Sequence, residues 1–208
     1  MYLLARQANL RGLDIEKWAV EIGAAAASGI GNEVGVWATV LSPGVGTMTW
    51  TSRWDDLSAV EKGFANLMTD TKYRDLAAQG AEFLNGPVND TLYETVYEGN
   101  APSNDVTYVG SVSAVCAPGN FARGMLGGIE IAQAVEKATG SSTEFLAGQT
   151  GAYGTVVWIA GYKDIAAYEA SQHALAADTS FVAMIDATTG AYQPDPSITQ
   201  ATLHMRLG

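Results

Sequence analysis

Cysteine and basic residues are scarce in this chain of 208 residues. Its single cysteine, Cys116, cannot form an internal disulfide, so a reducing compartment is the default and we predict a cytoplasmic protein. Lys and Arg number 11 against 22 Asp and Glu, which gives a formal net charge of -11. Because so acidic a surface repels phosphate groups, the composition argues against nucleic-acid partners and against anionic membranes.

Long apolar runs are also missing. No run reaches the roughly 18 residues that a membrane-spanning helix needs. Residues 1–6 lack the basic and then apolar pattern of a signal peptide, so we expect neither a signal peptide nor a membrane span. Hydrophobic residues still make up 48% of the chain and charged residues only 16%, which supplies a core and excludes disorder.

An internal repeat is the strongest signal that is present. Residues 46–73 align without a gap with residues 154–181, at an offset of 108 residues. The nine identical pairs are Gly46/Gly154, Thr47/Thr155, Trp50/Trp158, Asp56/Asp164, Ala59/Ala167, Glu61/Glu169, Leu67/Leu175, Asp70/Asp178 and Thr71/Thr179. We infer two homologous halves, 1–99 and 106–208, joined by a segment of linker composition at 99–105.

Both halves contain the same order of predicted elements. In the first half, strands are predicted at 2–9, 34–41, 47–54 and 91–97, with helices at 13–28 and from Asp55 or Asp56 onward. In the second half, strands are predicted at 106–116, 143–147, 155–160 and 198–207, with helices at 120–138 and 164–186. The order β-α-β-β-α-β, found twice, is that of the ferredoxin-like unit.

A ferredoxin-like unit carries both helices on one face of its sheet and leaves the other face bare. A unit of about 100 residues cannot leave such a face in water. We therefore predict an α+β fold in which two tandem ferredoxin-like repeats form an intramolecular pseudo-dimeric α/β barrel, with a cleft between the two sheets. The alternative is two separately folded domains on a string.

The repeated segment also resembles a known superfamily. It reads Trp54-Asp-Asp-Leu…Leu67-Met-Thr-Asp70-Thr-Lys-Tyr73 and recurs as Tyr162-Lys-Asp-Ile…Leu175-Ala-Ala-Asp178-Thr-Ser-Phe181. This spacing is similar to that of NIPSNAP-like members of the dimeric α/β-barrel superfamily and, less closely, to antibiotic-biosynthesis-monooxygenase-like members. The NIPSNAP-like sequences often place Pro after the Asp, where both copies here have Thr. The resemblance implies a barrel that binds a small apolar or aromatic molecule, with activities ranging over oxygenation, isomerisation, haem binding and none.

The last strand of each half carries the most useful polar pattern. Alternation places Glu94 and Glu98 on one face of the strand at 91–97, counting the residue directly after it. It likewise places His204 and Arg206 on one face of 198–207. The opposite faces carry apolar residues that should pack on helices. We predict that these four side chains reach the cleft, with His204 as a general base beside Glu94, and Glu98 and Arg206 as ligand contacts. Alternatively, Glu98 and Arg206 form a rim ion pair and His204 is a core histidine.

Other candidates are weaker. Trp50 and Trp158 occupy matched positions and could line a ligand cavity, although such a pair more often packs in a core. Cys116 could pair with a histidine as a nucleophile, but a buried, idle thiol is the better interpretation. His173 is expected to face solvent.

The sequence therefore predicts a binder of a small apolar or aromatic molecule. The alternatives are a cofactor-independent monooxygenase or isomerase of a secondary-metabolism type, and a haem-binding barrel. Two histidines and one cysteine lack the spacing of a zinc site, so no metal site is predicted. No cofactor is predicted, although haem held by a single histidine stays open. A homo-oligomer of pseudo-dimers also stays open.

Overall fold

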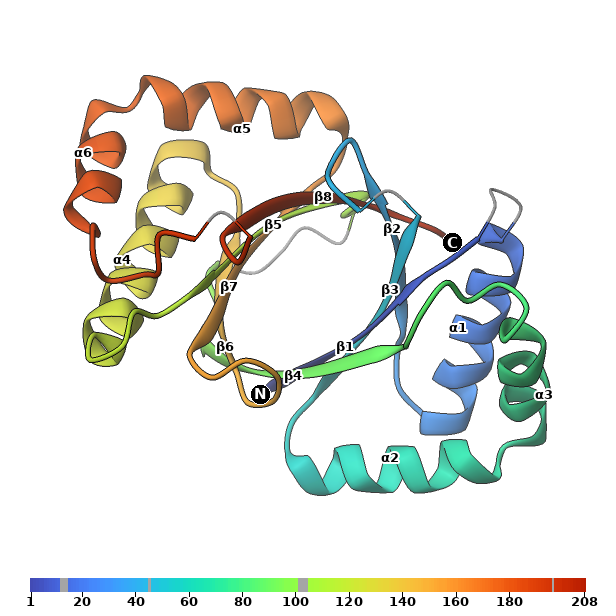
Figure 1. The fold of residues 1–208 in the computed structure, drawn as a ribbon. Helices are drawn as coiled ribbons and strands as arrows, with labels where there is room; N and C mark the ends of the chain where they lie inside the picture. The colour runs from blue at the N-terminus through green and yellow to red at the C-terminus, as the bar shows by residue number, and fades with distance from the viewer. Residues whose placement is uncertain (12–14, 45, 101–104, 196) are drawn as a thin grey trace. The chain divides into compact units, whose positions relative to one another are not determined.

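The computed structural model describes residues 1–11, 15–44, 46–100, 105–195 and 197–208 (Figure 1). The predicted start of the first helix at Leu13 and most of the predicted linker lie outside these residues. The chain divides into two compact units. Unit 1 comprises Met1–Tyr93 with Met205–Gly208, and unit 2 comprises Glu94–His204. The boundary of the units thus lies within two strands, whereas the sequence repeats divide at 99 and 106.

In its described residues, unit 1 contains three strands and three helices of its own. These are β1 (Tyr2–Asn9), α1 (Glu16–Ile30), β2 (Gly35–Val40), β3 (Thr47–Trp54), α2 (Leu57–Thr69) and α3 (Thr71–Gly80). Strand β3 is the centre of this sheet, since it pairs antiparallel with both β1 and β2. The first residues of β4 (Asn89–Tyr97) and the last residues of β8 (Gln200–Arg206) also belong to unit 1.

Unit 2 repeats this arrangement. Its own elements are β5 (Tyr108–Val115), α4 (Phe121–Thr139), β6 (Thr143–Gly148), β7 (Thr155–Tyr162), α5 (Ile165–Ala177) and α6 (Thr179–Ala187). Strand β7 pairs antiparallel with β5 and β6. Over the whole chain the strands follow the hydrogen-bonded order β1-β3-β2-β8-β5-β7-β6-β4, which closes on itself. The predicted α+β fold of tandem ferredoxin-like repeats in a closed α/β barrel is confirmed.

The structure corrects the second helix of each half. The sequence predicts one helix over 164–186, but Asp178 ends α5 and begins α6, and Asp70 separates α2 from α3 in the same way. Asp178 accepts hydrogen bonds from the backbone N–H groups of Ser180 and Phe181. These two Asp residues are therefore N-caps of an additional helix, which explains why both copies of the repeat contain them.

The N-cap at Asp70 yields a testable effect on stability. Its carboxylate accepts a hydrogen bond of 2.7 Å from the backbone N–H of Tyr73. Because Ala cannot satisfy this donor, Asp70→Ala should lower the free energy of unfolding by about 1 kcal/mol, measured by urea unfolding. Asp70→Asn keeps the cap and should change it little. An equal loss in both variants would contradict the capping role.

Tryptophan and glycine build the contact between sheet and helices in both units. In unit 1, Trp50 donates its indole N–H to the carbonyl of Ala19 on α1, at 2.9 Å. In unit 2, Trp158 donates to the carbonyl of Gly128 on α4, at 2.8 Å. Gly128 has no room for a Cβ, because the fully buried ring of Phe145 lies against it. Each sheet thus has one face covered by helices.

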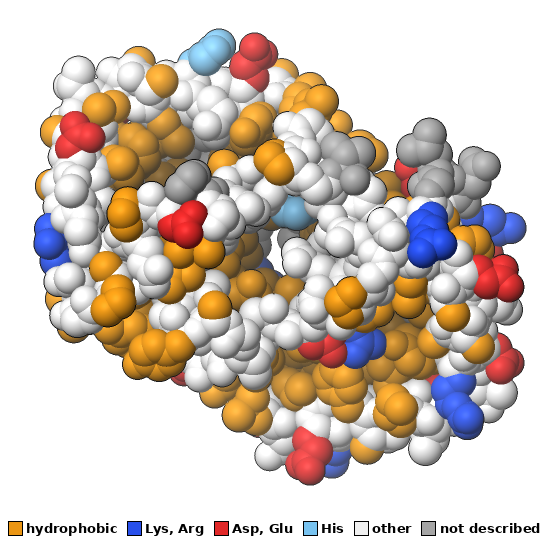
Figure 2. Space-filling view, in the orientation of Figure 1, with side chains coloured by type: hydrophobic (Ala, Val, Ile, Leu, Met, Phe, Trp, Pro, Cys, Tyr) orange, Lys and Arg blue, Asp and Glu red, His pale blue; other side chains and the backbone are white. Residues whose placement is uncertain are grey.

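The two units differ in how well their outer helices are buried. In unit 1, α2 and α3 bury Gly63, Leu67, Leu76 and Gly80. In unit 2, α5 buries only Ser171 among its residues, and no residue of α6 is buried. Hydrophobic side chains consequently reach the surface around α5 and α6 (Figure 2).

Candidate functional site

The face of the unit 2 sheet that turns away from α4 carries a polar cluster. Trp158 packs against α4, so the adjacent Ile159 on β7 points to the opposite face. Ser111 on β5 pairs with Ile159 and lies on that same face. Polar side chains on this face of the sheet therefore do not pack against α4.

Ser111, Thr202 and His204 form a hydrogen-bonded triangle on this face, which we call the His204 cluster. The hydroxyl oxygens of Ser111 and Thr202 are 2.6 Å apart. Nε2 of His204 lies 3.0 Å from Oγ1 of Thr202 and 3.3 Å from Oγ of Ser111. Alternation along β8 brings Thr202 and His204 to one face, while Leu203 between them is buried on the other. All three residues are half-buried.

Burial sets the charge of His204. Desolvation disfavours the imidazolium and lowers the pKa of His204 below its ordinary value. The ring is therefore neutral at pH 7, with one nitrogen that can accept a proton. A neutral imidazole joined to two hydroxyls can act as a general base or pass a proton along the chain of oxygens.

Glu94 lies at the other edge of unit 2. Its carboxylate is exposed and accepts a hydrogen bond of 2.9 Å from the amide of Gln149. Strand β4 neighbours β6, whereas β8 neighbours β5, so β5, β7 and β6 separate the strand of Glu94 from that of His204 in this unit. Two of the hydrogen-bonding partners of the His204 ring are the Ser111 and Thr202 hydroxyls, and its pairing with Glu94 stays a prediction.

The structure places Trp50 and Trp158 on the helix-covered faces. Each indole N–H is used by a helix carbonyl, and the Trp158 ring packs 5.1 Å from that of Phe145. This packing agrees with the core role that the sequence analysis weighed beside a ligand contact, and a ligand contact for either tryptophan stays a prediction.

Arg206 and Glu98 belong to different surroundings. Arg206 donates from Nη2 to Glu33 at 3.0 Å, and its guanidinium carbon lies 5.9 Å from the centre of the Trp37 ring. The acidic partner of Arg206 within unit 1 is thus Glu33. Glu98 is exposed and follows the end of β4. A ligand contact for either residue remains a prediction.

The environments of Cys116 and His173 are explained without a catalytic role. Cys116 is buried, and desolvation raises the pKa of its thiol. A Cβ on Gly124 would lie 2.6 Å from its sulfur, so the thiol fills a tight gap against α4. The expected idle thiol fits this environment, because an activated cysteine needs a lowered pKa. His173 is exposed on α5, as expected.

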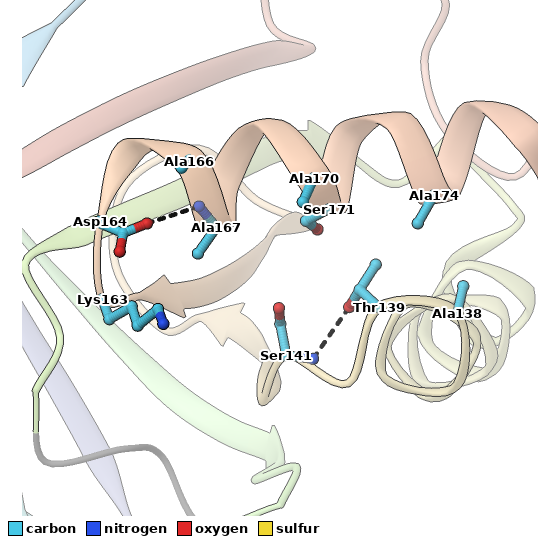
Figure 3. A pocket seen from close by; sticks show the side chains of 10 residues that line it. All are labelled: Ala138, Thr139, Ser141, Lys163, Asp164, Ala166, Ala167, Ala170, Ser171 and Ala174. Carbon is cyan, nitrogen blue, oxygen red and sulfur yellow. Dashed lines mark hydrogen bonds between the residues drawn. The ribbon is translucent and has the colours of Figure 1, made fainter.

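A groove between α4 and α5 lies on the helix side of unit 2 (Figure 3). It encloses about 460 Å³ and is walled by small side chains of α5, among them Ala170 and Ala174. Asp164 at its rim is already used, since it accepts from the backbone N–H of Ala167 at 2.7 Å. Lys163 lies beside it. The positions in unit 1 that match Ala170 and Ala174 hold the longer side chains of Lys62 and Asn66.

Haem held by a single histidine stays a proposal, and His204 and His173 are the two histidines of the sequence. The iron would have to take the place beside Nε2 of His204 that the Thr202 and Ser111 hydroxyls fill. His173 is exposed on α5. Within the described ranges, no three His, Cys, Asp or Glu residues gather as metal ligands.

No helix among the described residues is long and apolar enough to cross a membrane.

Known structures agree with this architecture at low sequence identity. A candidate monooxygenase of Fusobacterium nucleatum is 13% identical, with a TM-score of 0.73 over 100% of this chain and 92% of that one. An anthrone oxidase-like protein is 13% identical, with a TM-score of 0.65 over 100% and 93%. The chlorite dismutase of Candidatus Nitrospira defluvii is 11% identical, with a TM-score of 0.53 over 99% and 92%. No protein-family model and no curated protein matches the sequence. The chain has the fold of the dimeric α/β-barrel proteins.

Sequence reasoning missed two members of the His204 cluster. Ser111 and Ser113 alternate along β5 as Thr202 and His204 alternate along β8. This Ser-x-Ser pattern marks a polar face and could have been matched to that of β8. The match requires knowing that β8 lies next to β5, which only the strand order provides.

Proposed function

We propose that this protein binds a small aromatic molecule with an acidic hydroxyl or C–H group on the sheet face that carries the His204 cluster. The carrying observation is the hydrogen-bonded triangle of Ser111, Thr202 and His204. Its hydroxyls supply donors and acceptors, and the adjacent half-buried Ile159 supplies apolar surface for a ring. Binding is the first function, as the sequence predicts.

A second candidate function is proton abstraction followed by oxygenation without a cofactor. It is favoured by the neutral imidazole and by the names of two structural neighbours, a candidate monooxygenase and an anthrone oxidase-like protein. In this proposal the substrate proton passes to Oγ of Ser111, the Ser111 proton passes to Oγ1 of Thr202, and the Thr202 proton passes to Nε2 of His204. The carbanion left behind reacts with dioxygen. A methylene group then becomes a carbonyl, and the second oxygen atom leaves as water.

Anthrone is the probe that tests both candidates. Binding should raise the melting temperature of the protein as the anthrone concentration rises. Oxygenation would convert anthrone and dioxygen to anthraquinone and water, followed by absorbance. His204→Gln should then lower the rate by about 10²–10⁴-fold, the range for loss of a general base. The matched control is His173→Gln, which removes the exposed histidine and should leave the rate unchanged.

The pH dependence gives an independent check. Because burial lowers the pKa of His204, the base form persists below the ordinary histidine value of 6.5. The rate should be constant at neutral pH and fall on the acid side with a midpoint below 6.5. Binding without turnover would support the binder alone. Loss of neither binding nor rate in a folded His204→Gln protein would contradict the assigned site.

A further inference from the structure

The sheet face of unit 1 that turns away from α1 carries a second polar and aromatic surface. Trp50 on β3 points to α1, so its neighbours Thr49 and Thr51 point to the opposite face. Trp37 on β2 pairs with Thr49 and donates its indole N–H to Oγ1 of Thr51 at 2.9 Å. Arg206 lies over the Trp37 ring. We call this group, Trp37, Thr49, Thr51 and Arg206, the Trp37 surface.

Thr49 is the observation that sets this surface apart from ordinary packing. The residue is only 6% exposed, and its hydroxyl has no hydrogen-bond partner among the residues that the structure describes. A buried hydroxyl without a partner costs stability, so such groups are rare unless something else satisfies them. Thr49 pairs with Trp37 and Gln7 on the adjacent strands, so its side chain lies on the same sheet face as that of Trp37.

Arg206 supplies a charge next to the same ring. Its side chain is 36% exposed, and its partner Glu33 is 79% exposed. An ion pair with so exposed a carboxylate is worth little and is easily replaced by the carboxylate of a ligand. Arg is also suited to bind a carboxylate through two parallel hydrogen bonds while its plane stacks on an aromatic ring.

We propose that the Trp37 surface binds a planar aromatic carboxylate. The ring of the ligand lies against Trp37, its carboxylate pairs with Arg206 in place of Glu33, and a polar substituent or bound water satisfies Thr49. The assignment rests on residues of unit 1 alone, and it is independent of the function proposed for the His204 cluster.

The test uses 2-naphthoate with two matched analogues, and calorimetry as the measurement. The amide of naphthoate, 2-naphthamide, keeps the planar ring and removes the charge. Decalin-2-carboxylate keeps the charge and removes the planarity. Naphthoate should bind at least about tenfold more tightly than either analogue, as expected for loss of a charged hydrogen bond or of ring stacking. Equal affinities, or no naphthoate binding at millimolar concentration, would overturn the proposal.

Two variants locate the site. Arg206→Gln should weaken naphthoate binding by about tenfold or more, whereas Arg74→Gln, which removes the same charge from α3, should not. Thr49→Val should weaken binding of a hydroxylated probe, 3-hydroxy-2-naphthoate, by about fivefold. The same Thr49→Val change should leave the melting temperature of the free protein unchanged or higher, because it removes an unpartnered buried hydroxyl. A Thr49→Val protein that melts lower and binds normally would show a merely structural role and refute the assignment.

Discussion

Gly128→Ala should lower the free energy of unfolding by about 1–3 kcal/mol, the usual cost of overpacking a tight core. An added Cβ would overlap the ring of Phe145. That ring is fully buried and packs on Trp158, so it has no free space in which to move. The melting temperature should fall by about 2–4 °C for each kcal/mol lost.

The adjacent glycine of α4 provides the control. A Cβ on Gly127 would meet its nearest atoms at 3.9 Å, which is ordinary contact. Gly127→Ala should therefore be neutral or should stabilise the protein by about 0.5–1 kcal/mol, since Ala favours a helix over Gly. Similar effects of the two substitutions would show that the Phe145 contact does not limit the size of the side chain at position 128.

Glu136→Ala should have an effect of similar or larger size. The Glu136 carboxylate, on α4, accepts hydrogen bonds from the Tyr97 hydroxyl at 2.7 Å and from the backbone N–H groups of Asn100 and Thr143 at 2.7 and 3.1 Å. Removing it leaves three donors to find new partners, and we expect a loss of about 3 kcal/mol or more in urea unfolding. Glu130→Ala, on an exposed position of α4, should cost far less.

The pH dependence of stability tests whether the stabilisation by Glu136 depends on its charge. Burial alone would raise the pKa of Glu136, but the hydrogen bonds from Tyr97, Asn100 and Thr143 outweigh it and lower the pKa below the ordinary 4.5. The carboxylate therefore contributes its full stabilisation above pH 4.5 and loses it as the pH falls through the lowered pKa. The difference in stability between wild type and Glu136→Gln should shrink over that acid range. A constant difference would contradict the role of the charge.

Most of the fold could be predicted because the repeat and the alternation patterns agree. Strands at 2–9 and 47–54 match β1 and β3 to the residue. The helix breaks at Asp70 and Asp178 are not predicted from the sequence. Apolar spacing continues across each Asp, and an Asp that ends one helix can begin the next, which periodicity alone does not reveal.

The candidate site was harder to predict because it depends on which face each residue takes and which strands are neighbours. The Thr-Met-Thr-Trp alternation of β3 already indicates that Trp50 shares the apolar face with Met48, which is buried against helices. The pairing of Ser111 with His204, in contrast, joins residues far apart in the sequence. No local pattern contains that information.

The last residues of the chain belong to unit 1, and this affects the order in which the protein can fold. Met205 and Leu207 pack in the same core as Ala19 and Met48, and Leu207 donates a backbone hydrogen bond to Val36. On a ribosome, the core of the first unit stays unfinished while all of the second is made, a delay on the order of 10 s at ordinary rates of synthesis. Its apolar surface is exposed to chaperones for that time, and the half made first is the half completed last.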